Sequence, residues 1–182
     1  MKLYMELPAS HTIERLNNIM KACYPGTFDP ITRGHIDIIE RASRMFEEVV
    51  VLIMVNPRKQ CTLSEDERKD MIERSIQNLA TKDKIKVMIG SGLTVDYANK
   101  IGAGAIVRGI RAISDYEYEL QQATANLMLN DRIETLFFIA RPEYSFLSSS
   151  VVKEIASNGG DVTELIPVEI HDEVIQKLQK RL

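Results

Sequence analysis

The chain has 182 residues, of which 45% are hydrophobic, and its formal net charge is −3. This length predicts one domain with a single core, and the charge does not favour a protein that binds nucleic acid or an anionic membrane. The two cysteines, Cys23 and Cys61, do not form a C-x-x-C pair. We therefore expect a reducing, cytoplasmic compartment rather than a disulfide scaffold. No apolar run approaches the roughly 20 residues that span a bilayer.

Residues 1 to about 18 lie outside the pattern that organises the rest of the chain. Three alternatives stay open for them: a short helix that starts near Ser10, a flexible tail, or an upstream start that precedes Met20. They contain no apolar stretch of the kind that an export signal requires. We expect an N-terminal extension of unknown role over 1–18 and a single domain over 19–182.

Short apolar runs predict five strands. Residues 49–55 form an unbroken apolar run, which is typical of a strand buried on both faces. Similar runs occupy 85–89, 105–107 and 136–140, and a weaker one precedes Tyr24.

Helical spacing of apolar residues appears between these runs. Helices are expected after Gly34, over 94–101, over 148–157, and from Pro167, which suits a first helical turn, to the C-terminus. Two more carry a capping-box pattern, a serine followed three residues later by a glutamate: Ser64 with Glu67, and Ser114 with Glu117. The helix after Ser114 has its apolar stripe at 116, 120, 123 and 127. The alternation predicts an α/β fold, a doubly wound sheet of about five parallel strands with helices on both faces.

In such a sheet, ligands bind beyond the carboxyl ends of the strands. The segments that follow the predicted strands hold Thr27, Asp29 and Asn56, and they collect cations although the chain is acidic overall. These cations are Arg33, Arg58, Lys59, Arg108, Arg111, Arg141 and Lys153. The local excess of positive charge points to an anionic ligand, and phosphates fit best.

The connection after the first strand is the stretch YPGTFDPITRGH, residues 24–35. A simple connector needs about 2–6 residues, so this one is expected to hold a ligand. Gly26 would let the backbone approach that ligand, and Gly34 and His35 lie where a helix offers free N–H groups to an anion. Three serines at 148–150 open another helix. Neither segment matches a P-loop or G-x-G-x-x-G, so phosphates are expected to bind without these motifs.

Each candidate also has a purely structural explanation. Thr27 and the three serines could only cap a turn or a helix, Lys59 could only be solvated, and Glu119 could face either a ligand or water. His35 at a helix start and Arg108 after a buried strand favour a function.

Four segments together resemble one family. GTFDPITRGH at 26–35 resembles the T/H-x-G-H signature of the nucleotidylyltransferase superfamily. NPRK at 56–59 with the capping box after it, VRGIRAISDYEYE at 107–119 and YSFLSSSVVKE at 144–154 are similar to segments of the phosphopantetheine adenylyltransferases. The similarity runs from about residue 20 to the end, in that family's order and spacing.

The resemblance implies a Rossmann-like nucleotidylyltransferase fold and the transfer of AMP from ATP to 4′-phosphopantetheine. The products are dephospho-coenzyme A and pyrophosphate, formed by direct in-line attack without a covalent intermediate. The resemblance also implies Mg²⁺ bound through the ATP phosphates with no metal ligand from the protein, a cytoplasmic homohexamer, and dephospho-coenzyme A or coenzyme A as product or inhibitor. No nucleic-acid or membrane partner is expected.

The resemblance further assigns roles to residues. His35 matches the histidine credited with stabilising the transition state, and Lys59 and Arg108 match catalytic residues that bind the pantetheine phosphate. Thr27 matches a residue that orients this phosphate and also meets ATP, and Thr94 falls where a residue lines the pantetheine arm. Contacts with ATP are implied for Thr27, Phe28, His35, Gly109, Ile110, Arg111, Glu119, Tyr144, Ser145, Phe146, Leu147, Ser148, Ser149 and Ser150.

The sequence departs from the family at a few places. Leu63 replaces an aromatic residue, Gln60 and Cys61 replace a common Lys-Pro, and Tyr144 replaces a common tryptophan, so affinity is expected to change rather than chemistry. The residues agree with the chemistry independently, because an ionised acceptor phosphate needs no general base, only positioning and neutralised charge.

Two rival functions stay open. One is another nucleotidylyltransferase of the superfamily that acts on a nicotinamide mononucleotide or an alcohol phosphate. The other is a non-catalytic nucleotide-binding sensor that retains the pocket.

Overall fold

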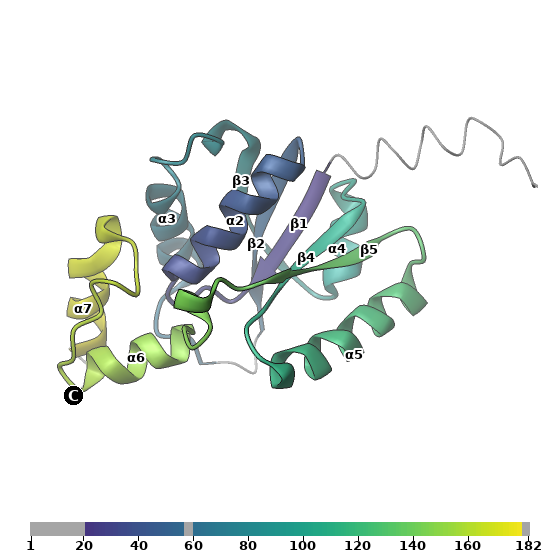
Figure 1. Ribbon diagram of the computed structural model, residues 1–182. Helices are drawn as coiled ribbons and strands as arrows, with labels where there is room; N and C mark the ends of the chain where they lie inside the picture. The colour runs from purple at the N-terminus through teal and green to yellow at the C-terminus, as the bar shows by residue number, and fades with distance from the viewer. Residues whose placement is uncertain (1–20, 57–59, 180–182) are drawn as a thin grey trace, which may run out of the picture.

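The computed structural model describes residues 21–56 and 60–179, and it shows one sheet of five parallel strands (Figure 1). The strands are β1 (Lys21–Gly26), β2 (Glu48–Val55), β3 (Ile85–Ser91), β4 (Ala105–Ile110) and β5 (Glu134–Ile139). Their order is β3-β2-β1-β4-β5, so the chain moves outward from β1 on one side and then returns to place β4 on its other side. The predicted fold class is confirmed, and every strand falls on a predicted apolar run.

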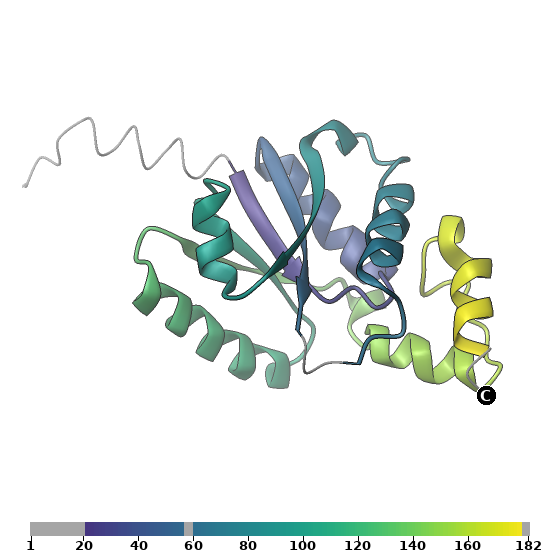
Figure 2. The ribbon, with the colours of Figure 1, turned by 180° about the vertical axis from the view of Figure 1, so that it is seen from behind.

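Helices cover both faces of this sheet. Figures 1 and 2, which show the molecule from opposite sides, place α2 (Arg33–Met45) and α4 (Thr94–Lys100) on opposite faces. Helix α3 (Glu65–Ser75) shares a core with α2, and α5 (Ile113–Leu129) runs beside α4 along β4 and β5. After β5 come α6 (Ser149–Ser157) and α7 (His171–Gln179), which join the core of α2 and α3. Short 3₁₀ turns cover Lys82–Lys84, Pro142–Tyr144 and Val168–Ile170.

The central strand β1 contributes side chains to two separate cores. Ala22 and Tyr24 belong to the larger cluster with α2 and α3, whereas Cys23 points into the smaller cluster with α4. Each of the three is at most 5% exposed. Successive side chains of a strand point to opposite faces, so burial on both faces explains the continuous apolar runs of the inner strands β2 and β4, whereas burial alternates along the edge strands β3 and β5.

The strands β1 and β4 separate at their carboxyl ends. Ala22 pairs with Ala105 and Cys23 with Ile106, and no later register pair joins these two fully described strands. In contrast, β1 pairs with β2 along its whole length. The strand order reverses between β1 and β4, and open α/β sheets bind ligands at such a switch point.

Two predicted helix starts have different outcomes. The capping box of Ser64 and Glu67 is present at the start of α3, as predicted. The predicted box of Ser114 and Glu117 is wrong, because α5 already begins at Ile113. The N-cap is Ala112, which makes no side-chain cap hydrogen bond, and Asp115 in the first turn accepts the backbone N–H of Arg111, the residue before the cap, at 3.1 Å.

Two further boundaries differ from the prediction. Strand β4 continues to Ile110, beyond the predicted run 105–107, so Arg108 belongs to the strand rather than to the loop after it. Pro167 precedes a 3₁₀ turn, and α7 begins only at His171.

Within 21–56 and 60–179, no helix has the length and apolar character needed to cross a membrane.

Candidate active site

A cavity of about 500 Å³ lies at the carboxyl edge of the sheet, where β1 and β4 separate. Its walls come from the β1–α2 connection, the end of β4 and the segment that leads into α6. The β1–α2 connection belongs to the stretch YPGTFDPITRGH, which was expected to hold a ligand. Thr27, His35, Arg108, Arg111 and Lys153 all line this cavity.

A second cavity, of about 710 Å³, shares a wall with the first. Pro25, Gly26, Thr27, Arg108 and Glu119 line both cavities. The second cavity extends from this shared wall towards the first turn of α4, which includes Thr94, and along α5. Two ligands that occupied the two cavities would therefore meet at Thr27 and Arg108.

His35 is held by the first turn of α2. The Thr32 backbone N–H donates to His35 Nδ1 at 3.1 Å, and the His35 backbone N–H donates to Thr32 Oγ1 at 3.3 Å, which together form a capping box. Because Nδ1 accepts this hydrogen bond, we assign the ring proton to Nε2. Burial, with Arg111 and Arg108 nearby, lowers the pKa of His35 to about 4. His35 is therefore a neutral hydrogen-bond donor at physiological pH.

Gly26 lines both cavities, and its predicted close approach to a ligand stays a prediction. A Cβ atom at this position would lie 2.6 Å from Phe28 Cζ, so the glycine also leaves the space that the Phe28 ring fills. Phe28 itself has a φ of 51° and is 2% exposed. Its ring packs edge-on against His35, with the two centroids 5.1 Å apart. Phe28 thus packs against the His35 ring and supports its position.

Arg68 fixes the position of Thr27. No pattern in the sequence assigned a role to this arginine. This arginine is 1% exposed, and its Nη1 donates to the Thr27 carbonyl at 2.8 Å while Nε donates to the Ser64 carbonyl at 3.2 Å. The bonds tie the β1–α2 connection to the start of α3. No sequence signal distinguishes Arg68 from a solvated helical arginine, since its long-range partner is a backbone carbonyl and its ion pair with Glu65 is a common contact within a helix.

Asp29 ties together three segments around the cavity. Its carboxylate accepts the backbone N–H groups of Thr62 and Leu63 at 3.0 and 2.9 Å, and Lys153 Nζ of α6 at 2.8 Å. Burial works to raise the pKa of Asp29, but these donors outweigh it and hold the pKa below its usual value. Asp29 is therefore a structural anion that also neutralises Lys153.

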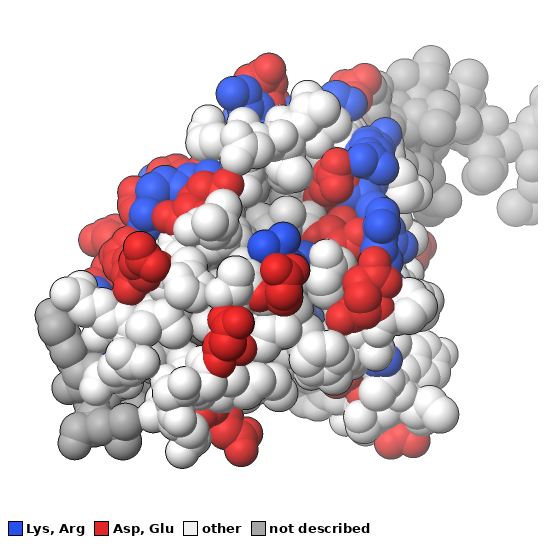
Figure 3. Space-filling model, turned by 60° about the vertical axis from the view of Figure 1, so that its left-hand side comes forward, with Lys and Arg blue, Asp and Glu red and all other residues white. Residues whose placement is uncertain are grey.

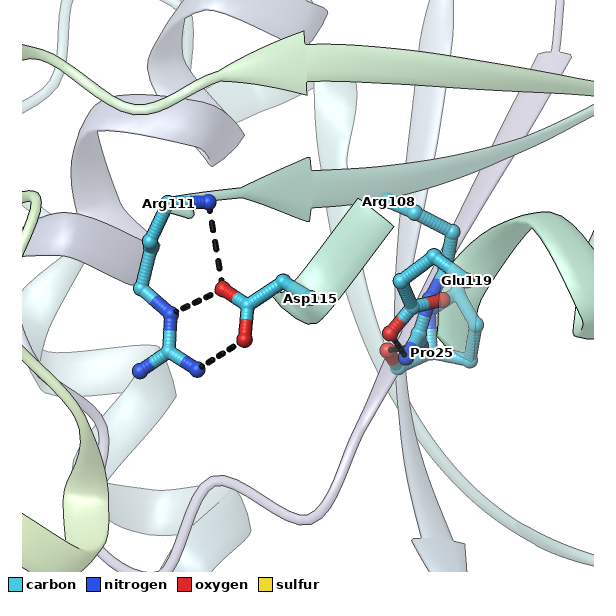
Figure 4. Close-up of polar contacts among 5 residues, drawn as sticks. All are labelled: Pro25, Arg108, Arg111, Asp115 and Glu119. Atoms are coloured by element: carbon cyan, nitrogen blue, oxygen red, sulfur yellow. Dashed lines mark hydrogen bonds and ion pairs between the residues drawn. The ribbon is translucent and has the colours of Figure 1, made fainter. Parts of the chain in front are cut away.

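Arg108 crosses the gap between β1 and β4 (Figure 4). Its Nη1 donates to the Pro25 carbonyl at 2.7 Å, while Nε and Nη2 donate to the two carboxylate oxygens of Glu119 at 2.6 and 2.5 Å. Burial works to lower the pKa of Arg108, but the bond to Glu119 raises it above its usual value. The sequence left open whether Glu119 faces a ligand or water, and in the structure it lines both cavities.

Arg111 is held in a similar way at the start of α5 (Figure 4). Its Nε and Nη2 donate to Asp115 at 2.8 and 3.0 Å, and its Nη1 donates to the Leu147 carbonyl at 3.0 Å. Arg111 thereby joins α5 to the segment that leads into α6. The first cavity lies between these two elements.

Each of the three cations that line the first cavity has a carboxylate partner. Arg108 is paired with Glu119, Arg111 with Asp115, and Lys153 with Asp29. On the face shown in Figure 3, acidic and basic side chains likewise lie next to one another. For these three cations the positive charge is therefore balanced by a neighbouring carboxylate, which the prediction of a local positive excess did not take into account.

The structure brings most of the predicted site residues to the two cavities. The first cavity is lined by Thr27, Phe28, His35, Arg108, Gly109, Arg111, Glu119, Tyr144 and residues 147–150, and the second by Thr94. Ile110, Ser145 and Phe146 line neither: Ile110 is buried, Ser145 Oγ donates to the Pro142 carbonyl at 2.8 Å, and Phe146 is 57% exposed. Lys59 lies outside the described residues.

Comparison with known proteins identifies the family. A model of cytidylyltransferase-like proteins matches residues 23–155. A phosphopantetheine adenylyltransferase from Finegoldia magna is 47% identical over 164 residues, which are 90% of this chain and 99% of that protein. Proteins of the same name from Thermotoga neapolitana and Heliobacterium modesticaldum are 48% and 46% identical over 88% and 86% of this chain, and 98% and 91% of their own. This chain belongs to the phosphopantetheine adenylyltransferase family.

Solved structures with much lower identity share the fold of this family member. Plasmodium falciparum nicotinic acid mononucleotide adenylyltransferase, complexed with NaAD, superposes with a TM-score of 0.63 at 17% identity, over 88% of this chain and 95% of that one. A bifunctional NMN adenylyltransferase/ADP ribose pyrophosphatase from Francisella tularensis gives 0.64 at 16% identity, over 86% of this chain and 48% of that one. The fold is thus the Rossmann-like fold of nucleotidylyltransferases.

Proposed function

We propose that this chain transfers the adenylyl group of ATP to 4′-phosphopantetheine and releases dephospho-coenzyme A and pyrophosphate. The observation that carries the proposal is the junction of the two cavities at Thr27 and Arg108, with His35 on the wall of the first. One cavity can hold the nucleotide and the other the acceptor arm, so that the two reacting phosphates meet. Relatives at 46–48% identity bear the name of the same activity.

The proposed reaction needs positioning and charge stabilisation rather than a base. An oxygen of the acceptor phosphate attacks the α-phosphorus of ATP, the bond from that phosphorus to the α–β bridging oxygen breaks, and pyrophosphate leaves with the electron pair. The acceptor oxygen is already ionised, so no proton has to be removed. His35 Nε2–H donates to an oxygen of the α-phosphoryl group as charge develops in the transition state. Its low pKa suits this role, since a neutral imidazole donates without releasing its proton.

The remaining residues divide between the two ligands. We assign Arg108, Thr27 and Thr94 to the acceptor, together with Lys59. Thr94 supports this division because it lines only the second cavity. ATP is assigned to the first cavity, with Thr27, Phe28, His35, Glu119 and the segments 109–111 and 144–150. Within these segments Ser149 Oγ donates to the Pro30 carbonyl, whereas Ser148 Oγ accepts the Val151 N–H at the start of α6 and keeps its own O–H available, so direct hydroxyl contacts with phosphate are assigned to Ser148 and Ser150.

We propose that Mg²⁺ accompanies the triphosphate and is held by its oxygens. The described residues do not fit a resident metal, because they contain no group of three or more histidine, cysteine or acidic side chains that could hold one. The two carboxylates that line the first cavity are committed, Asp29 to Lys153 and Glu119 to Arg108.

We further propose that the chain forms a homohexamer, as the family resemblance implies. Helix α5 supports association, since its only buried residue is Glu119. Tyr116, Leu120 and Leu127 of the predicted apolar stripe are 44%, 43% and 47% exposed, and Met128 is 84% exposed. Strand β5 lies at the edge of the sheet beside this helix. A single chain leaves this apolar surface uncovered, and copies of the same chain would cover it.

A cytoplasmic location is proposed as well. Both cysteines are free, and burial raises the pKa of Cys23 to about 12, which keeps its thiol protonated. Cysteines that form no disulfide suit a reducing compartment.

The decisive experiment is a turnover assay with ATP, Mg²⁺ and 4′-phosphopantetheine, in which pyrophosphate and dephospho-coenzyme A are both quantified. Equal amounts of the two products are expected, and coenzyme A added to the same assay tests whether it inhibits. Nicotinamide mononucleotide and an alcohol phosphate such as glycerol 3-phosphate serve as competing acceptors. Turnover with one of these alone would contradict the proposal, and so would ATP binding without any product.

A further inference from the structure

Two carboxylates of one helix hold Arg108 and Arg111 in the same geometry (Figure 4). In each arginine the edge formed by Nε and Nη2 faces a carboxylate, Glu119 or Asp115, and Nη1 donates to a backbone carbonyl. Asp115 and Glu119 are four residues apart on α5, so they lie one turn apart on the same face of that helix. The repetition indicates a common purpose rather than two chance ion pairs.

The geometry leaves the same part of each arginine free. A guanidinium has five N–H groups, and three of them are used by these partners. Within the described residues, one N–H on Nη1 and one on Nη2 of Arg111 have no bonded partner. Arginine N–H groups without a partner can donate to phosphate oxygens, and Arg111 lines the first cavity.

We propose that Asp115 is a positioning residue for ATP, which holds Arg111 so that its free N–H groups meet the triphosphate. The identity of the anion rests on the proposed function. Asp115 reaches Arg111 through both carboxylate oxygens and also accepts its backbone N–H, so both the side chain and the backbone of Arg111 are fixed. Burial works to raise the pKa of Asp115, but the Arg111 guanidinium outweighs it, so Asp115 stays ionised at neutral pH.

Two other roles for Asp115 make different predictions. If the carboxylate competed with the triphosphate for Arg111, its removal would strengthen ATP binding. If it only capped α5, its removal would lower stability and affect both substrates equally. Asparagine separates these roles, because its carbonyl oxygen can still accept the Arg111 backbone N–H, while its amide group cannot accept from the guanidinium.

The test compares Asp115→Asn with the unchanged protein in two measurements. Isothermal titration calorimetry with ATP gives the Kd, and steady-state kinetics gives the KM for each substrate. We expect the Kd and KM for ATP to rise about 3- to 10-fold, because an unfixed arginine must be ordered on binding. The KM for 4′-phosphopantetheine is expected to stay within twofold. Asp66→Asn is the matched control, since Asp66 also lies in the first turn of a helix, is exposed and lines neither cavity.

A double-mutant cycle tests whether Asp115 acts through Arg111. In an Arg111→Ala background, Asp115→Asn should change the Kd for ATP no further. Arg111→Lys keeps the charge but loses the two-point contact with Asp115, so it should weaken ATP binding as Asp115→Asn does. It replaces Asp115→Asn in the test if the asparagine variant does not fold. Tighter ATP binding, an equal rise in both KM values, or an added loss in the Arg111→Ala background would each overturn the proposal. Calorimetry needs no turnover, so a protein that binds ATP without forming product would refute the proposed function and leave this test readable.

Discussion

The proposed chemistry depends on one residue and on its protonation state. His35 is a neutral donor because its site is partly buried and because Arg108 and Arg111 lie close to it, which together lower its pKa to about 4. Thr32 then fixes the tautomer through the backbone N–H that donates to Nδ1. Such a donor is set in place before the reaction, and preorganised donors of this kind act mainly on the transition state.

His35→Ala should therefore lower kcat by roughly 10²- to 10³-fold, with far smaller changes in ATP binding. The lost capping contact should lower the free energy of unfolding by about 1 kcal/mol. Steady-state kinetics beside a thermal melting curve measures both. In the unchanged protein, His35 should contribute no titration of kcat near pH 6.5, since it stays neutral as the pH falls until it approaches 4. If kcat holds within a few-fold, or if the variant simply unfolds, His35 is structural and the mechanism is wrong.

Arg108 provides a second test, directed at the acceptor. Arg108→Ala should raise the KM for 4′-phosphopantetheine more than the KM for ATP, because Arg108 lies on the wall shared with the second cavity. Arg108→Lys should recover only part of the loss, since lysine cannot bind phosphate and Glu119 at two points each. Kinetics with each substrate varied in turn measures the difference. An effect on ATP alone would assign Arg108 to the nucleotide instead.

At the scale of elements, the cavity depends on bonds that join loops from different parts of the chain. Asp29→Asn should lower the free energy of unfolding by roughly 2–3 kcal/mol, because a buried carboxylate with three donors is replaced by a neutral amide. The folded-state pKa of Asp29 lies below its unfolded value, so its stabilising effect is present above the unfolded value and is lost as the pH falls through the folded one. Urea unfolding at neutral pH and near pH 3 measures this.

The exposed residue Asp83 supplies the control for Asp29. Asp83→Asn should leave the free energy of unfolding unchanged at both pH values. An Asp29→Asn variant as stable as the unchanged protein at neutral pH would show that the three donors do not depend on the negative charge.

Helix α5 should decide the oligomeric state. Replacing both Leu120 and Leu127 by glutamate places charge on the exposed apolar stripe, so the assembly should dissociate into smaller particles. Size-exclusion chromatography with light scattering measures the mass. Gln176→Glu, on the exposed face of α7, adds charge elsewhere and should leave the mass unchanged. A double variant with the mass of the unchanged protein would exclude this stripe as the subunit contact.

At the scale of the whole molecule, the described core begins at β1. The relatives from Finegoldia magna and Thermotoga neapolitana are matched over 98–99% of their own length by 88–90% of this chain. A variant that starts at Met20 should therefore fold and keep its activity nearly intact. A variant that starts at Thr27 lacks the central strand and should not fold. Circular dichroism and turnover measure both, and failure of the Met20 variant to fold would contradict the predicted domain boundary.

Prediction from sequence succeeded where the signal is local or periodic. The run 49–55 shows a strand buried on both faces, and Ser64 with Glu67 shows a helix start, because each pattern is set by neighbours along the chain. Prediction failed at Ser114, where the same serine–glutamate pattern is present but the carboxylate of Asp115 accepts the backbone N–H of Arg111 instead. It also missed that Gly26 makes room for the ring of Phe28, which has a left-handed backbone conformation.

The amino-acid sequence by itself determined the fold class, the family and the set of residues that follow the strands, because hydrophobic period and motif spacing are properties of the linear chain. Only the tertiary structure decided how these residues are paired. Arg108 meets Pro25, Lys153 meets Asp29, and Arg68 meets the Thr27 carbonyl, all across long stretches of sequence. The tertiary structure also decided the pKa of His35. Burial lowers this pKa, and so do two arginines, one on β4 and one in the segment after that strand. Charge and hydrogen bonding act over a few ångströms in space, and a linear sequence does not contain that distance.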